Sequence, residues 1–210
     1  MEQKAVQLDQ EIISCPICLD LLKDPPKTRA GFLRYSYAIT MDPNTAHTLL
    51  LLSEGNRKAI RMSPQQSYSD HPDRFTMLLQ VLSRESLTGR CYWEVEWRGG
   101  VVGVAVAYKN ISRAGSTDEC GFGSNDKSWI LYCFTDDYKF YHNKVQTPVS
   151  GPRSSRVGVY LDHRAGILSF YSVSDTMTLL HRVQTTFTQP LYAGLRFCLS
   201  GGSAEFCELE

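Results

Sequence analysis

The chain has 210 residues, the length of one ordinary domain or of one large β domain. Hydrophobic residues make up 42% of it and aromatic residues 11%, so we expect a substantial core. Lysine plus arginine equals aspartate plus glutamate at 22 each, so no global field attracts nucleic acid or an anionic membrane surface. No apolar run is long enough to cross a bilayer. These features argue against nucleic-acid-binding and membrane-spanning classes.

The cysteine usage predicts a cytoplasmic protein. There are seven cysteines, an odd number, and residues 1–10 are polar and lack the apolar core of a secretory signal. Free thiols in a reducing compartment are therefore expected, in place of a disulfide framework.

The first chemical motif is the pair Cys15 and Cys18. A C-x-x-C pair gives two thiolates to tetrahedral zinc, which needs two more ligands. The next cysteine is Cys91, and the intervening His47 and His71 have no ligand spacing. The pair is therefore a zinc half-site only. We expect no cofactor, with zinc as the exception if other ligands complete the site.

Residues 1–26 form a separate stub, irregular or partly helical, and Pro25 and Pro26 end any regular element there. Residues 27–31 are expected to be a junction. From residue 32 onward the pattern is almost entirely β, with short apolar runs separated by turn residues. About a dozen strands at this spacing predict an all-β fold, a two-sheet antiparallel β-sandwich. The expected strands are 49–52, 57–62, 78–82, 91–97, 101–108, 129–134, 138–141, 157–161, 167–173, 178–183, 191–197 and 205–209.

Two of these strands carry most of the information about which face is buried. In residues 91–97, Trp93 and Trp97 share a face with Cys91, and Glu94 and Glu96 lie on the other, as in a half-buried strand. The tryptophans are therefore expected in the core. Residues 129–134 differ because both of their faces are apolar. An apolar second face predicts a protein-binding surface, unless another segment covers it.

The segment from residue 32 onward resembles the PRY-SPRY domain of tripartite-motif (TRIM) proteins, and its sequence is most similar to the fish-type group. We expect the PRY part at 32–85 and the SPRY part at 86–210. The resemblance implies a β-sandwich that recognises a protein target, without catalysis of its own. The motifs that carry it are MDPNTA (41–46), LSEGN (52–56), GRCYWEVE (89–96), VGVYLDHRAGILSFY (157–171) and PLYAG (190–194).

The N-terminal stub resembles the start of a TRIM RING finger, through CPICLD (15–20) and LLKDP (21–25). A RING needs eight zinc ligands, and this chain offers two at the right spacing. We therefore expect residues 1–26 to be a truncated RING remnant and the chain not to be an enzyme. No heptad stretch is present to dimerise through, so we expect a monomer.

The family resemblance places partner contacts on the strand 129–134 and its neighbouring loops. Tyr132 and Phe134 are the best contact candidates, joined by Ile130 on the same face. Candidate rim positions are Arg98, Asp126 and Phe197, within the segments 98–100, 124–127, 135–137 and 196–197. The alternative is that the PRY segment or a long loop covers this face.

The sequence thus favours a cytoplasmic protein-interaction module, in a TRIM-type ubiquitination or innate immune setting. Two other readings stay open: a RING-type ubiquitin ligase, incomplete in this chain, and a carbohydrate-binding sandwich, because fold alone does not determine function. The identity of the protein target is not encoded in any transferable motif.

Overall fold

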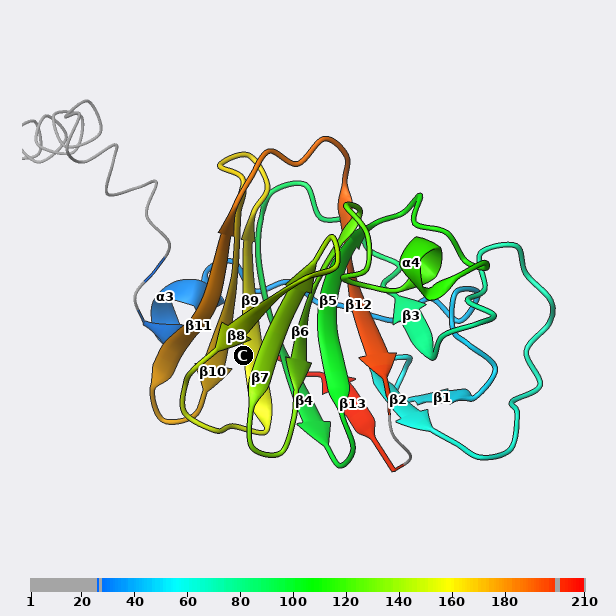
Figure 1. Ribbon diagram of the computed structural model, residues 1–210. Coiled ribbons are helices and arrows are strands. Elements are labelled where there is room, and N and C mark those ends of the chain that lie inside the picture. Colours follow the sequence, from blue (N-terminus) through cyan, green and yellow to red (C-terminus); the bar gives the residue numbers. More distant parts are fainter. Residues whose placement is uncertain (1–25, 27, 199–200, 210) are drawn as a thin grey trace, which may run out of the picture.

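The computed structural model describes residues 26, 28–198 and 201–209, so the RING-remnant prediction and its Cys15 and Cys18 lie outside the described part of the chain. The described residues form two short helices and thirteen strands (Figure 1). The helices are α3 (Arg29–Leu33) and α4 (Thr117–Cys120). The strands are β1 (Leu50–Ser53), β2 (Lys58–Arg61), β3 (Gln80–Leu82), β4 (Arg90–Arg98), β5 (Val102–Tyr108), β6 (Ser128–Cys133), β7 (Tyr138–His142), β8 (Val145–Val149), β9 (Arg156–Asp162), β10 (Ile167–Val173), β11 (Met177–Gln184), β12 (Leu191–Phe197) and β13 (Ser203–Phe206).

The strands build two antiparallel sheets that pack face to face, which confirms the predicted sandwich (Figure 1). The seven-stranded sheet has the order β1-β2-β13-β4-β9-β10-β11, and the six-stranded sheet has the order β3-β12-β5-β6-β7-β8. One strand, β8, was not predicted from the sequence. It holds Pro148 and lies at a sheet edge, where a residue without a backbone N–H is tolerated.

The main core lies between the two sheets and is built from alternate residues of each strand. From β4 it takes Trp93 and Trp97 together with Cys91 and Val95, all at most 9% exposed. From β6 it takes Trp129 with Leu131 and Cys133. The period-two pattern therefore assigned these residues to the correct face of each sheet.

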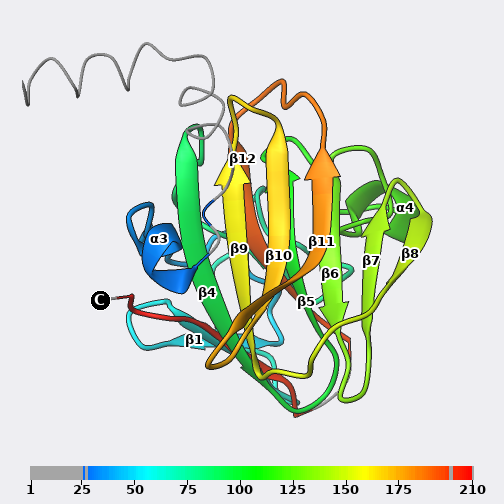
Figure 2. The same ribbon diagram turned by 90° about the vertical axis from the view of Figure 1, so that its left-hand side faces the viewer.

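Part of the outer face of the seven-stranded sheet is covered at β4, which corrects the expectation that the residues alternating with the β4 tryptophans face water. Tyr92 and Glu94 are both 0% exposed because α3 lies across this sheet (Figure 2). Phe32 of α3 stacks on Tyr92 with ring centroids 5.1 Å apart. Arg29 donates hydrogen bonds to both carboxylate oxygens of Glu94, at 2.7 and 3.2 Å. Residues 29–33, predicted as mostly junction, are thus part of the packed domain.

The connections follow the local sequence. The β1–β2 hairpin turns through Glu54, Gly55 and Asn56, which all have positive φ. The link from β4 to β5 contains Gly99 and Gly100, both at φ 61°, and it carries the chain from one sheet to the other. A backbone in this left-handed region favours glycine because a Cβ atom is strained there. Among the described residues, no helix is both long enough and apolar enough to span a membrane.

Candidate functional site

Four strands of the six-stranded sheet place a row of side chains on its outer face. Tyr132 of β6 pairs with Gly103 of β5 on one side and with Lys139 of β7 on the other. Arg196 of β12 pairs with Gly103 from the far side. Since Gly103 has no side chain, the space above it is filled by the side chains of Ile130 and Tyr132. The guanidinium carbon of Arg196 lies 5.7 Å from the Tyr132 ring centroid.

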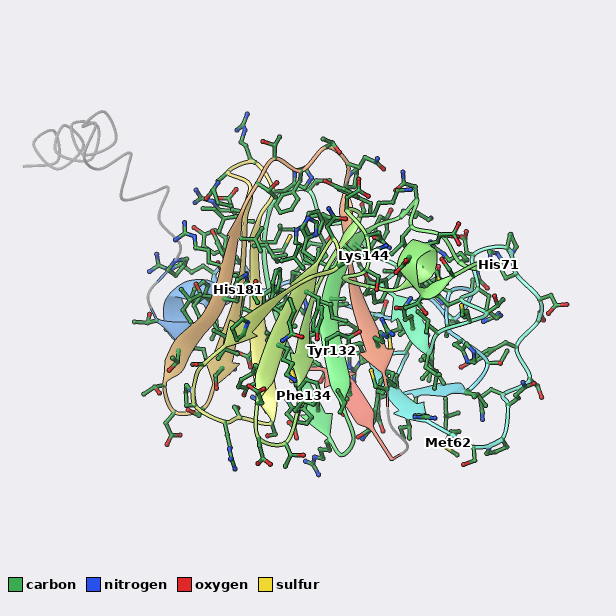
Figure 3. The ribbon with its side chains drawn as sticks, in the orientation of Figure 1. Met62, His71, Tyr132, Phe134, Lys144 and His181 are labelled. Carbon is green, nitrogen blue, oxygen red and sulfur yellow. The ribbon has the colours of Figure 1, made fainter. Side chains whose placement is uncertain are left out.

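A hollow of about 620 Å³ opens over this row, and half-buried Tyr132 lies in its wall. Figure 3 shows Tyr132 between Lys144 and Phe134 along the same face of the sheet. The lining is mixed, with aromatic rings, one carboxylate and two cations. It consists of Val101, Asp118, Phe122, Gly123, Ser124, Tyr132, Phe134, Tyr141, Lys144, Arg196 and Cys198.

The aromatic rings of the hollow contact one another. Tyr132 packs edge-to-face against Tyr141 with centroids 5.5 Å apart, and its centroid lies 6.4 Å from that of Phe134. The Lys139 ammonium sits 5.0 Å from the Phe134 ring centroid. Such ring pairs add to the energy of burial and hold one another in position. The result is a partly exposed aromatic cluster with a fixed shape.

The sheet beneath the cluster is only partly covered, which answers the question left open by the two apolar faces of β6. Ile130 is 0% exposed, because Phe122 from the segment after α4 and Phe75 from the PRY part close over it. Tyr132 lies further along β6 and Phe134 directly follows its end, and both remain partly exposed. A loop therefore covers one end of this face and leaves the other end open.

The segment from α4 to β6, which forms one wall of the hollow, is held by its own hydrogen bonds. The side-chain amide of Asn125 donates to three backbone carbonyls, those of Asp118, Glu119 and Gly121. The backbone N–H of Lys144 donates to Gly123, and the Lys144 ammonium pairs with Asp118 at 2.7 Å. This wall is preorganised, so a ligand need not order it on binding.

Burial changes the acidity of two groups in the hollow. It raises the pKa of Tyr132 well above the ordinary tyrosine value. Burial also raises the pKa of Cys198, although the neighbouring Arg196 opposes that rise. Both groups are therefore neutral at physiological pH. Arg196 and Lys144 are the two cations of the lining, and no nucleophile with a base beside it appears among the lining residues.

Two family models together match nearly the whole β-sandwich. The SPRY domain model matches residues 90–207, more than half of the chain, and the SPRY-associated domain, PRY, matches residues 39–87. The chain belongs to the PRY-SPRY family. The resemblance drawn from its motifs is thus confirmed, whereas the RING remnant at the N-terminus stays a prediction.

Curated relatives carry this PRY-SPRY region within much longer proteins. Mouse tripartite motif-containing protein 16 is 40% identical over 81% of this chain and 31% of its own length. Stonustoxin subunit beta of Synanceia horrida is 42% identical over 79% of this chain and 24% of its own length. The chain thus spans about a quarter to a third of these two relatives. Their different names show that the domain alone does not determine the activity of the whole protein.

Two solved structures share the PRY-SPRY fold closely. The stonustoxin structure aligns with a TM-score of 0.80 at 36% identity, over 86% of this chain and 30% of that one. The crystal structure of the TRIM65 PSpry domain aligns with a TM-score of 0.78 at 25% identity, over 93% and 96%. The domain is accordingly a protein-interaction module.

The PRY-SPRY structure separates the predicted site residues into two groups. Tyr132 and Phe134 line the hollow, as the side chains of a binding surface would. Ile130 and Phe197, at 0% and 2% exposed, are too deeply buried to contact a partner directly, so the prediction for these two is corrected. Ile130 supports the hollow from below, and Phe197 belongs to the core between the sheets.

The two predicted charged residues lie away from the hollow. Arg98 is exposed at the end of β4, where it pairs with Glu96 at 2.8 Å. It lines a second hollow of about 490 Å³ that shares Phe134 with the first and includes Thr135 and Asp137. Asp126 is exposed before the start of β6, at the opposite end of that strand from Phe134.

The sequence-based site prediction included Arg196 in the rim segment 196–197 but missed other lining residues of the hollow, among them Tyr141 and Lys144. The signal for Arg196 was present, because alternation along β12 sends Leu195 and Phe197 into the core and Arg196 outward. Tyr141 has the same alternation relative to buried Phe140. Lys144 carried no such signal, since a turn residue has no regular period.

The described residues contain no group of three or more histidine, cysteine, aspartate or glutamate side chains arranged to hold a metal ion. The half-site at Cys15 and Cys18 lies outside the described part of the chain. Cys91, Cys120 and Cys133 are free thiols buried in the domain, and Cys198 and Cys207 are free and more exposed.

Proposed function

We propose that this PRY-SPRY domain recognises a protein target through the hollow on its six-stranded sheet, with Tyr132 and Phe134 as apolar anchors. The observation that carries the proposal is the open end of the β6 outer face. There, aromatic rings are half-exposed, fixed by mutual contacts and surrounded by a hydrogen-bonded wall. Binding energy in protein interfaces concentrates on such aromatic anchors, at about 2 kcal/mol or more each.

Two other hollows support this choice by contrast. One is lined by Lys58, Glu96, Arg98 and Arg156 with other polar residues, and its charges already pair with one another. Another surrounds Arg90 and Asp162, which are joined at 2.6 Å. Neither presents an aromatic cluster, so neither offers the apolar contact on which a protein interface depends.

The setting of the module is proposed from its relatives. Tripartite motif-containing proteins 16 and 14 of mouse share this domain. We place the chain in the cytosol as a monomer. There it recognises a target protein within a TRIM-type ubiquitination or innate immune pathway. A chain that carries the target-reading domain competes with a full-length ligase for the same target. Light scattering on the purified chain measures its molar mass and thereby tests whether it is a monomer.

The test compares proximity labelling in cells expressing the wild type, Tyr132→Ala or Phe134→Ala. We expect a reproducible set of labelled proteins with the wild type that both substitutions lose. Leu179→Ala is the matched control, because Leu179 is 47% exposed on β11 of the other sheet and is expected to leave the set unchanged. Thermal unfolding verifies that each variant is folded. An identical set for all folded variants would rule out this hollow as the recognition surface.

A further inference from the structure

The hollow contains a cation, Arg196, beside which the described residues place no anion. Arg196 is half-buried on β12, and among the described residues no carboxylate forms an ion pair with it. The one carboxylate that lines the hollow within the described chain, Asp118, is 2.7 Å from the Lys144 ammonium. A partly desolvated charge without a partner is costly, and a ligand that neutralises it gains that energy on binding.

The groups that do contact Arg196 leave its charge in place. Its guanidinium carbon is 5.7 Å from the centroid of the Tyr132 ring, and the thiols of Cys198 and Cys120 are also neighbours. All three groups are neutral at physiological pH, because burial raises the pKa of each. A guanidinium that lies near an aromatic ring keeps N–H donors at its edge, which match the two oxygens of a carboxylate.

The apolar part of the hollow lies directly beside this cation. Tyr132 contacts Arg196 on one side and Phe134 on the other, with ring centroids 6.4 Å apart. Lys139 adds a second positive charge over the Phe134 ring, at 5.0 Å. An occupant of the hollow therefore meets a cation and an aromatic wall about 6 Å apart. In an extended peptide this is close to the spacing of side chains two residues apart, at about 3.3 Å per residue, and such side chains lie on the same face.

We propose that the target enters the hollow as an extended peptide segment with an aspartate or glutamate two residues from a large apolar residue. The carboxylate bonds to Arg196, and the apolar side chain packs on Tyr132 and Phe134. This inference rests on the proposed function and specifies the chemistry of its partner. Charge complementarity selects the acidic segment over a basic one, which Arg196 and Lys139 repel.

The experiment selects random peptides displayed on phage against the wild-type domain, Arg196→Gln and Arg196→Glu. Peptides from the wild type are expected to share an acidic residue near a large apolar one. Arg196→Glu is expected to select a basic residue at the acidic position. Wild-type peptides should lose about ten- to a hundredfold in affinity for Arg196→Gln, the range for a charge-assisted hydrogen bond.

Controls separate the side-chain charge from other causes. Arg182→Gln removes an exposed arginine from β11 of the opposite sheet and should leave peptide affinity unchanged. The selected peptides are synthesised with amidated C-termini, so that no terminal carboxylate takes the place of the side chain. Arg196→Lys, which keeps the charge but loses the planar fork, is expected to bind with intermediate affinity.

Each outcome decides between the two proposals. Selected peptides that depend on Tyr132 and Phe134 but show no acidic preference would overturn the acidic-segment inference and leave the recognition surface standing. Binding that vanishes on amidation would overturn it in favour of a terminal carboxylate. Peptides whose affinity is unaffected by Tyr132→Ala and Phe134→Ala in folded protein would overturn both proposals.

Discussion

Tyr132 and Gly103 lie directly opposite each other on β6 and β5, and the missing side chain of Gly103 makes room for the Tyr132 ring. A Cβ atom at position 103 would lie 3.2 Å from Cε1 of Tyr132 and 3.0 Å from Cγ1 of Ile130. Ile130 is 0% exposed under Phe122, so it has little space to move. The shape of the hollow therefore depends on a glycine that does not line it.

Gly103→Ala is expected to destabilise the domain by about 1–2 kcal/mol. Overpacking a filled site costs roughly 1–3 kcal/mol, and the lower entropy of the unfolded chain offsets about 0.4–1 kcal/mol of that. The same change should weaken target binding by displacing Tyr132. Gly89→Ala is the control, because a Cβ there would meet no atom within 4 Å. Urea unfolding measures the stability of Gly103→Ala and Gly89→Ala. Equal midpoints for the two variants would contradict the packing argument.

Arg29→Ala is expected to lower the free energy of unfolding by about 1–2 kcal/mol. Glu94 is 0% exposed and loses two charge-assisted hydrogen bonds, although Arg156 remains 3.4 Å from its carboxylate. The estimate is below the full value of such bonds because the Arg29 side chain is 40% exposed. Arg34→Ala, at the exposed C-cap of α3, should stay within about 0.5 kcal/mol of wild type. Chemical denaturation of both variants checks this, and a wild-type midpoint for Arg29→Ala would show that α3 is not held by the pair.

Stability is expected to fall as the pH drops below about 6.5, with His181 as one cause. Burial lowers the pKa of His181 from its ordinary value of 6.5, and its ring stacks on Phe140 with centroids 3.9 Å apart. Below pH 6.5 the unfolded chain therefore binds a proton that the folded state resists. The stability present above 6.5 is lost as pH falls through the folded pKa.

His181→Phe keeps a ring against Phe140 but cannot bind a proton, so its stability should depend less on pH over this window. His47 still contributes in the variant, because burial also lowers its pKa. Thermal unfolding of both proteins between neutral and mildly acidic pH gives the comparison. Parallel curves for wild type and variant would exclude His181 as a source of the acid sensitivity.

The purified chain is expected to contain less than one zinc ion per molecule. Cys15 and Cys18 supply two of the four ligands that tetrahedral zinc needs, and the described residues offer no cluster to complete the set. Elemental analysis by mass spectrometry after dialysis measures the content. Cys15→Ser serves as the reference. One or more zinc ions per wild-type molecule, absent from Cys15→Ser, would restore the RING interpretation.

The sequence predicted the outward direction of Tyr132 correctly but not what lies around it. Alternation along 129–134 is a local property of a strand, so it separates Tyr132 from Leu131 without any knowledge of the fold. The same alternation marks Arg196 as outward and Phe197 as inward, although both were predicted as rim positions.

Coverage of the outer faces is where prediction from the pattern failed. Tyr92 and Glu94 alternate with core residues and so resemble a solvent-exposed face, yet α3 buries them. Ile130 resembles a contact residue, yet Phe122 and Phe75 cover it. Whether a face is exposed depends on segments distant in the chain, and a strand's period carries no information about them.

By itself, the sequence determined the two-sheet sandwich, the family, the strand faces and the aromatic character of the second face of β6, because each follows from local alternation or from contiguous motifs. The tertiary structure alone decided that a loop closes one end of that face and leaves Tyr132 and Phe134 open. It also decided that Arg196 comes to lie beside Tyr132 without a carboxylate. These relationships join strands far apart in sequence, and only the packing of the sheet and its covering loops brings them together.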